Sequence, residues 1–235
     1  MGPILDLNIY GLRARINCHY QKDRRDISRL LKLFLDDEAT PAARIIDFRR
    51  KEIPQEIGGL LFPHLARMGI WAMHSGGFHF HGGILTIGPS NCGKSTFTYL
   101  AMKNGFPLLS DDVTLMREGA DGIQLLQFYS AIYLRDKIVA PKKGLFKPAM
   151  LRCLLVLSFK NGPVRVKKIR KRIEKLRRIT PQFLWSYRQA EQKRQKQFVE
   201  KMCDYPAYEV CWNSYVFSKD NALREILDGI VQGAG

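Results

Sequence analysis

Apolar and polar side chains alternate in parts of residues 5–20, which is the pattern of a half-buried strand or a hairpin. Residues 26–36 change to helical spacing, with large apolar side chains on one helix face at Ile27, Leu30, Leu31, Phe34 and Leu35. Asp26 is a residue type that caps helix N-termini, so we expect this helix to begin there. The pattern predicts a small α/β lead-in over residues 1–53, packed on a larger domain over residues 54–235.

The stretch after Pro54 predicts a regular series of elements. A largely buried helix is expected over residues 55–71, started or interrupted near Pro63 and closed by Gly69. The run Gly83–Ile87 is almost entirely apolar, as in strands of parallel sheets that are covered on both faces. The elements expected around it are a strand at 73–80, a helix at 96–103, and a strand that begins at 107–109 and ends at Ser110-Asp111-Asp112.

The second half of the chain continues the alternation of strands and helices. Strands are expected at 124–134, 153–159 and 208–217, and helices at 181–203 and 221–231. Residues 164–178 begin with strand-like alternation and continue as a basic helix. Alternating elements of the two kinds predict the α/β fold class.

Charge is concentrated in one segment of the chain. The formal net charge is +16, and residues 137–201 hold 20 of the 38 Lys and Arg residues but only three of the 22 acids. The densest part, residues 165–178, is compatible with three roles: contact with nucleic-acid phosphates, a solvated helix face, or a positive wall that attracts an acidic peptide or a phosphorylated product. Aromatic residues are sparse within it, which argues against a platform for single-stranded nucleic acid.

The five cysteines indicate a reducing compartment. They contain no CxxC pair and no zinc-type spacing with histidine, and an odd number does not form a closed disulfide set. No N-terminal segment resembles a signal peptide, and no run approaches the ~20 apolar residues of a membrane span. We therefore expect a soluble, cytoplasmic protein with no membrane partner.

The strongest chemical motif is a phosphate-binding loop. Its residues fit the pattern GxxxxGK[ST] between a buried strand and a helix, which is the structural setting that the motif requires. Backbone N–H groups and a helix N-terminus attract phosphate there, Lys94 adds a positive charge, and the Ser95 hydroxyl can ligate Mg²⁺. The residues expected to bind nucleotide are Gly88, Pro89, Ser90, Asn91, Cys92, Gly93, Lys94, Ser95 and Thr96.

An acidic pair, Asp111-Asp112, follows the next expected strand, which we place beside the strand of the phosphate loop. One carboxylate at such a position can hold Mg²⁺ while the other accepts a proton from an attacking hydroxyl. Switch-type GTPases also carry DxxG and NKxD elements, and neither pattern occurs after the loop. The pair therefore favours transfer of a phosphoryl group to a hydroxyl.

Three stretches, LLFPHLARMGIWAMHSGG, GGILTIGPSNCGKST and GFPLLSDDVTL, resemble the C-terminal catalytic domain of HPr kinase/phosphorylase and its shorter HPr-kinase-like relatives. The resemblance covers about residues 58–116, and PAYEVCWNS near the C-terminus is also similar. It implies a P-loop kinase core and ATP- and Mg²⁺-dependent phosphorylation of a serine in a peptide or protein.

By position, the resemblance implies a general base at Asp111, a metal-associated carboxylate at Asp112, phosphate and Mg²⁺ contacts at Lys94 and Ser95, and an active-site histidine at His74. The chain departs from the bifunctional enzyme in two respects: its N-terminal part is too short for the separate N-terminal domain, and Thr96 follows Ser95 where the family has an acidic residue.

The sequence supports three hypotheses. The first is a serine kinase; short relatives in lasso-peptide biosynthesis imply that the acceptor could be the C-terminal serine of a precursor peptide. The others are a nucleic-acid-binding P-loop ATPase, suggested by residues 165–178, and a kinase for a small molecule. Homo-oligomerisation is compatible with each of them.

Overall fold

The computed structural model describes residues 4–36, 44–48, 53–129, 132–134, 137–139, 148–160, 162–186, 188–213 and 222–232. The chain forms two compact units, Met1–Gly69 and Ile70–Gly235, and the helix after Pro54 lies within the first. The α/β class predicted from the sequence is confirmed. Among the helices described, none is both long enough and apolar enough to cross a bilayer.

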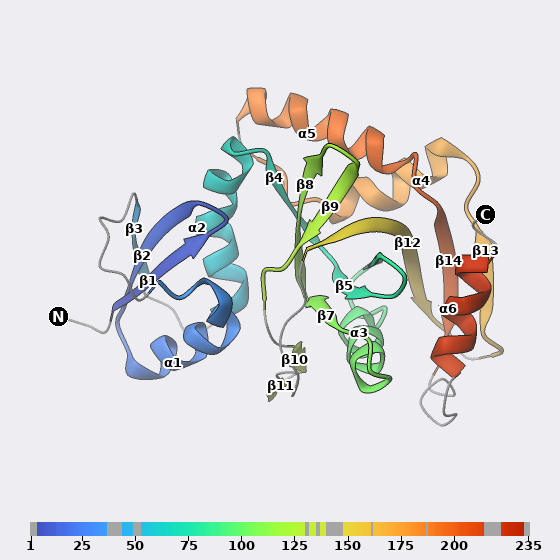
Figure 1. Ribbon diagram of the computed structural model, residues 1–235, viewed down its shortest axis with the longest axis horizontal. Helices are drawn as coiled ribbons and strands as arrows, with labels where there is room; N and C mark the ends of the chain where they lie inside the picture. The colour runs from blue at the N-terminus through green and yellow to red at the C-terminus, as the bar shows by residue number, and fades with distance from the viewer. Residues whose placement is uncertain are drawn as a thin grey trace. The chain divides into compact units, whose positions relative to one another are not determined.

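The first unit is a small sheet with helices (Figure 1). Strands β1 (Ile4–Ile9) and β2 (Leu12–Cys18) form the expected hairpin, and β3 (Arg44–Phe48) pairs in parallel with β2. The hairpin turn consists of Tyr10 and Gly11, whose φ angles of 51° and 93° are the left-handed values that a two-residue turn requires. The helical elements are α1 (Gln21–Leu30), a short 3₁₀ turn η1 (Lys32–Phe34) and α2 (Ile53–Arg67).

Helix α1 begins earlier than predicted, so Asp26 is not its N-cap. The cap position is Tyr20, and the first turn contains Asp23, whose side chain is buried and whose negative charge suits a helix N-terminus. Apolar spacing alone missed this turn because QKDRR contains no large apolar residue. The predicted helix face is otherwise correct in that Ile27, Leu31 and Phe34 are buried.

The second unit is built on a nine-stranded sheet in the order β4-β8-β9-β12-β6-β5-β7, with β14 beside β12 and β13 beside β14 (Figure 1). The strands are β4 (Ile70–His74), β5 (Gly76–His79), β6 (Gly83–Ile87), β7 (Leu108–Ser110), β8 (Val113–Gly119), β9 (Gly122–Leu126), β12 (Ala149–Phe159), β13 (Arg165–Lys168) and β14 (Ala207–Trp212). A separate hairpin is formed by β10 (Ile132–Leu134) and β11 (Lys137–Val139).

Strand β12 organises this sheet. Its first residues pair with β9 in antiparallel fashion, and its later residues pair in parallel with β6 on one side and with β14 on the other. Strand β5 is antiparallel to both β6 and β7. Strands β6, β7, β12 and β14 therefore run in one direction, and their C-terminal ends lie at the same edge of the sheet.

Helices α3 (Lys94–Lys103) and α6 (Ala222–Gln232) cover one face of these strands. Their apolar side chains join those of β6, β12 and β14 in one buried cluster that includes Ile84, Phe97, Leu155, Trp212 and Leu227. Helices α4 (Arg172–Ile179) and α5 (Gln189–Met202) run along the end of the sheet away from α3 (Figure 1). The burial of this cluster is the main force that fixes the strands beneath the helices.

Several predicted elements differ in extent. The strand expected at 73–80 is divided at Ser75 into β4 and β5, and the one expected at 124–134 is divided into β9 and β10. The helix expected at 181–203 begins only at Gln189, because Phe183 and Leu184 are extended along the edge of β4, where Leu184 N donates to Ala72 O at 3.0 Å. The last predicted strand ends at Trp212, and its expected continuation from residue 214 lies outside the described residues.

Basic side chains of α4 stabilise the C-terminal end of α5. Lys175 Nζ donates to the carbonyl oxygens of Cys203 at 2.7 Å and Tyr205 at 2.6 Å, and Arg172 donates to Glu200 O at 2.7 Å. These carbonyls lie at the end of a helix, where partial negative charge gathers and internal hydrogen-bond partners run out. Part of the basic segment therefore has a structural role.

We expect Lys175→Met to lower the free energy of unfolding by about 1 kcal/mol, because it leaves two carbonyls without their charged donor at a half-buried position. The measurement is urea denaturation followed by circular dichroism. The control is Lys196→Met, which removes the same charge from an exposed position on α5 and should change stability by a few tenths of a kcal/mol. Equal effects of the two substitutions would contradict the capping role.

Candidate active site

The phosphate loop has the geometry of an anion site. It leaves the buried strand β6 at Gly88, exposes Pro89, Ser90 and Asn91, and enters α3 at Lys94. The φ angles of Gly88, Asn91 and Gly93 are 152°, 62° and 87°, which turn the backbone in the way that such a loop requires. Asn91 takes the left-handed conformation that asparagine tolerates.

Lys94 is folded over this loop and is largely buried. Its Nζ donates to Gly88 O at 2.9 Å and to Pro89 O at 3.1 Å. An ammonium group has three N–H donors, so these two bonds orient it and leave one donor for a phosphate oxygen. Ser95 and Thr96, in the first turn of α3, are partly exposed.

Trp212, the last residue of β14, packs against the phosphate loop. A Cβ added at Gly93 would lie 2.4 Å from Trp212 Cζ2, so only glycine permits this approach. The indole Nε1 donates to Cys92 O at 3.2 Å, and the buried ring also packs edge-to-face with Phe97 of α3. Sequence reasoning did not assign this role to Trp212, because the contact joins residues that are distant along the chain.

The acidic pair lies at the same edge of the sheet as the phosphate loop, but β7 is not the neighbour of β6 that the sequence predicted. Strand β5 is inserted between them. It brings Gly76 against the hydroxyls of Thr86 and Thr98, where an added Cβ would lie 2.7 and 2.1 Å from the two oxygens. The ends of β6 and β7 are therefore separated by two strand spacings, about 10 Å.

Asp112 is the partly exposed member of the pair, and it contacts His74. His74 Nε2 lies 3.2 Å from Asp112 Oδ1, and the Asp112 side chain is 29% exposed. The structure therefore brings together two residues that the sequence could only connect through the family resemblance. Burial raises the pKa of the Tyr129 phenol, and the nearby charge of Asp112 raises it further.

A tight turn sets the direction of the two carboxylates. Val113 N donates to Asp111 O at 2.8 Å, and Asp112, between them, has φ 65°. A hydrogen bond across three residues with positive φ in the middle is the rarer and more strained kind of γ-turn. The turn leaves Asp111 1% exposed and turns Asp112 outward. Ser75 N, which donates to Asp112 O at 3.0 Å, ties the turn to the end of β4.

These residues suit a triphosphate with Mg²⁺. The loop offers backbone N–H groups and the Lys94 ammonium to phosphate oxygens, while Ser95 and Asp112 offer hard oxygen ligands. The described residues contain no group of three His, Cys, Asp or Glu side chains placed to hold a metal ion. Mg²⁺ commonly takes one or two protein oxygens together with substrate phosphates, so the donor set is sufficient.

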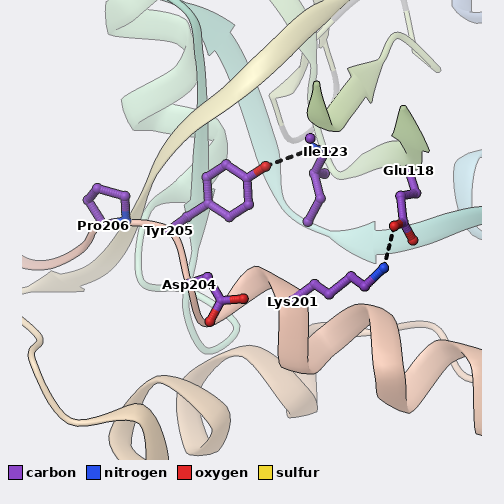
Figure 2. A pocket seen from close by; sticks show the side chains of 7 residues that line it. Glu118, Ile123, Lys201, Asp204, Tyr205 and Pro206 are labelled. Carbon is purple, nitrogen blue, oxygen red and sulfur yellow. Dashed lines mark hydrogen bonds and ion pairs between the residues drawn. The ribbon is translucent and has the colours of Figure 1, made fainter. Parts of the chain in front are cut away.

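A cavity of about 430 Å³ lies elsewhere, lined by Glu118, Gly122, Ile123, Lys201, Asp204, Tyr205 and Pro206. Figure 2 shows Tyr205 directed at Ile123, whose N–H donates to the phenol oxygen at 2.8 Å, and Lys201 paired with Glu118. These residues precede β14 or lie at the β8–β9 turn, whereas the phosphate loop is near the far end of β14. The cavity is therefore not part of the candidate active site.

The exposed basic residues of 165–178 remain without an assigned ligand. Every side chain of β13 is exposed, and three basic residues of α4 have protein partners: Arg172 and Lys175 at the end of α5, and Arg178, which lies 3.4 Å from Glu209. Part of the positive charge of residues 165–178 is therefore paired with carbonyl and carboxylate groups of the protein itself.

No protein-family model matches the sequence, and no curated protein matches it. Among solved structures, the chain is similar to the Hpr(Ser) kinase/phosphatase from Coxiella burnetii, with a TM-score of 0.40 and 12% sequence identity. The match covers 69% of this chain and 88% of that one. A likeness of this size carries no argument about function, which therefore has to be inferred from the geometry of the site itself.

We expect Gly93→Ala to abolish tight binding of a triphosphate and to lower the free energy of unfolding by about 3 kcal/mol, because the methyl group meets Trp212 in addition to the left-handed strain. The matched control is Gly105→Ala. Gly105 has φ 82°, but no atom of the described residues lies within 4 Å of an added Cβ, so only the strain, about 1 kcal/mol, should remain. Indistinguishable losses in the two variants would show that Trp212 does not constrain the loop.

We also expect Cys92 to react slowly with iodoacetamide in the native protein at pH 8. Burial raises the pKa of its thiol, more than the nearby Lys94 charge lowers it, so little reactive thiolate is present. All five cysteines are free, and Cys211 is the one that is partly exposed. Peptide mapping by mass spectrometry should find Cys211 labelled first; labelling of Cys92 ahead of Cys211 would contradict the burial argument.

Proposed function

We propose that this chain is an ATP- and Mg²⁺-dependent kinase that transfers the γ-phosphate to a serine hydroxyl of a peptide or protein. The observation that supports this most directly is the shared edge of the sheet, where β6 ends in the phosphate loop and β7 ends in the Asp111-Asp112 turn; the two strands are two strand spacings, about 10 Å, apart. That separation accommodates the transferred phosphoryl group and the acceptor between the two.

In this proposal the loop and Lys94 hold the β- and γ-phosphates, and Ser95 and Asp112 hold Mg²⁺. When bound, the ion neutralises charge on the phosphate oxygens. His74, 3.2 Å from Asp112, keeps that carboxylate turned toward the loop edge and is therefore a positioning residue.

Asp111 accepts the proton of the acceptor hydroxyl. Its burial keeps water away from the carboxylate in the free protein, which favours transfer to an acceptor over hydrolysis. Acceptor binding then has to open a path to this side chain. Asp111 lies at the end of β7, in the γ-turn closed by Val113 N. The Ser110 hydroxyl donates to Val113 O and so stabilises the same turn. The position of the Asp111 carboxylate therefore does not depend on a flexible segment.

The acceptor is proposed to be a serine in a peptide, and in the sharper form of the hypothesis the C-terminal serine of a lasso-peptide precursor. A nucleic-acid-dependent ATPase is less well supported, because Arg172, Lys175 and Arg178 of the basic segment have protein partners. A small-molecule kinase would share all the residues named above and would differ only in the acceptor.

The test is phosphate transfer from ATP to peptides that end in serine, with otherwise identical peptides that end in alanine, followed by mass spectrometry. Asp111→Asn should lower the transfer rate about a hundredfold or more without changing ATP affinity, at every Mg²⁺ concentration, because a general base acts on the acceptor. Asp112→Asn should instead raise the Mg²⁺ concentration needed for half-maximal transfer by about tenfold or more, since it removes a metal ligand.

Asp121→Asn, on the exposed β8–β9 turn, is the control and should leave transfer unchanged. If high Mg²⁺ restored transfer in Asp111→Asn but not in Asp112→Asn, Asp111 would be the metal ligand and Asp112 the general base. That result would contradict the assignment. ATP hydrolysis that rises with added RNA or DNA, with no transfer to any peptide, would overturn the kinase proposal itself.

A further inference from the structure

Phe159 is an exposed aromatic ring next to the support of the phosphate loop. It is the last residue of β12, it is 49% exposed, and its register partner on β14 is Trp212. The two rings pack edge-to-face with their centroids 5.2 Å apart. Because Trp212 contacts Gly93, a single side chain separates the Phe159 ring from the loop.

Among the large apolar side chains that are exposed in the described part of the second unit, namely Met150, Phe159, Val166 and Ile173, Phe159 is the aromatic one. An exposed ring at the end of a strand loses the hydrophobic stabilisation that burial would give it. A flat ligand stacked on the ring would recover that stabilisation, and a nucleobase is the flat part of a nucleotide.

Lys160 and Gly162, which follow Phe159, are held in place. Lys160 N donates to Trp212 O at 3.0 Å, and the Asn213 side-chain amide donates to Gly162 O, so the chain beyond β12 is tied to the end of β14. The position of Phe159 is thus fixed by β-sheet pairing on one side and by these bonds on the other. A stacking platform has to be rigid in this way before the ligand arrives.

The direction of the triphosphate places its base on this side. The γ-phosphate has to face Asp111 and Asp112, which lie on the β5–β7 side of β6. The nucleoside therefore extends to the opposite side of β6, where β12 and β14 end. Phe159 lies at that end, at the edge of the sheet that also carries the loop.

We propose that Phe159 is the stacking platform for the nucleobase and that the site takes purine nucleoside triphosphates in preference to pyrimidine ones. This inference rests on the proposed function only in that the loop binds a triphosphate with its γ end toward the acidic pair. Stacking depends on ring area and not on a hydrogen-bond pattern, so adenine and guanine should bind with similar affinity and cytosine and uracil more weakly.

The test compares ATP with inorganic tripolyphosphate, which has the same phosphate chain and no base, by calorimetry with Mg²⁺ on the full chain. Phe159→Ala should weaken ATP about tenfold, a loss within the range found for base–aromatic stacking, and leave tripolyphosphate unchanged. Phe159→Tyr should bind ATP as the unsubstituted chain does. The control is Met150→Ala, an exposed apolar side chain at the other end of β12, which should alter neither ligand.

Each alternative result overturns the inference. Equal weakening of ATP and tripolyphosphate by Phe159→Ala would mean that the ring acts only through Trp212 on the loop. Unchanged ATP affinity in Phe159→Ala, with a normal melting temperature, would place the base elsewhere, as would equal affinity of the unsubstituted chain for ATP and UTP. Binding of neither ligand by the unsubstituted chain would reject the triphosphate site itself, and with it the proposed function; the other three results would leave the proposed function intact.

Discussion

The contact between Trp212 and the phosphate loop is the constraint on which the site depends. The indole ring lies so close to Gly93 that no Cβ fits, and its N–H satisfies the carbonyl of Cys92. A buried ring of this size contributes a large hydrophobic area, and its one polar group has a partner, so the contact stabilises without a desolvation penalty. The shape of an eight-residue motif near the middle of the chain is therefore set by a strand near its C-terminus.

Strand β12 sets the position of Trp212 relative to the phosphate loop, because it pairs with both β14 and β6. The pairing of Val156 with Ile87 and of Phe159 with Trp212 aligns the ends of β6, β12 and β14 at one edge. On the other side of β6, the small size of Gly76 lets β5 pack against Thr86 and Thr98, and β5 fixes how far β7 lies from the loop. The aromatic rings of Trp212 and Phe159 thus lie on the β12–β14 side of the loop. The carboxylates of Asp111 and Asp112 lie on the other side, beyond β5. In the proposed function, this asymmetry sets the direction of a bound triphosphate.

The sequence predicted the local part of this arrangement well. The order of buried strand, phosphate loop, helix, strand and acidic pair is confirmed, because each step is encoded by neighbouring residues such as Gly88, Lys94 and Gly105. A strand was predicted at 73–80, but its division at Ser75 and the place of β5 between β6 and β7 were missed, because strand pairing is not local. The contacts that Trp212 makes with the phosphate loop and with Phe159 were missed for the same reason. The exposed Asp112 and buried Asp111 depend on a γ-turn that no spacing rule predicts.

The charge of the chain illustrates why composition is a weaker guide than position. A net charge of +16 suggests a polyanionic partner, yet Arg172 and Lys175 bind carbonyls at the end of α5, where a helix terminus rather than a ligand supplies the negative potential. Helix α4, which carries these residues, lies at the end of the sheet away from α3, whereas the lysine of the phosphate loop, Lys94, is held by the carbonyls of Gly88 and Pro89. A single ammonium with its donors oriented in a closed loop contributes more to phosphate binding than many solvated ones, because solvent and salt screen exposed charges.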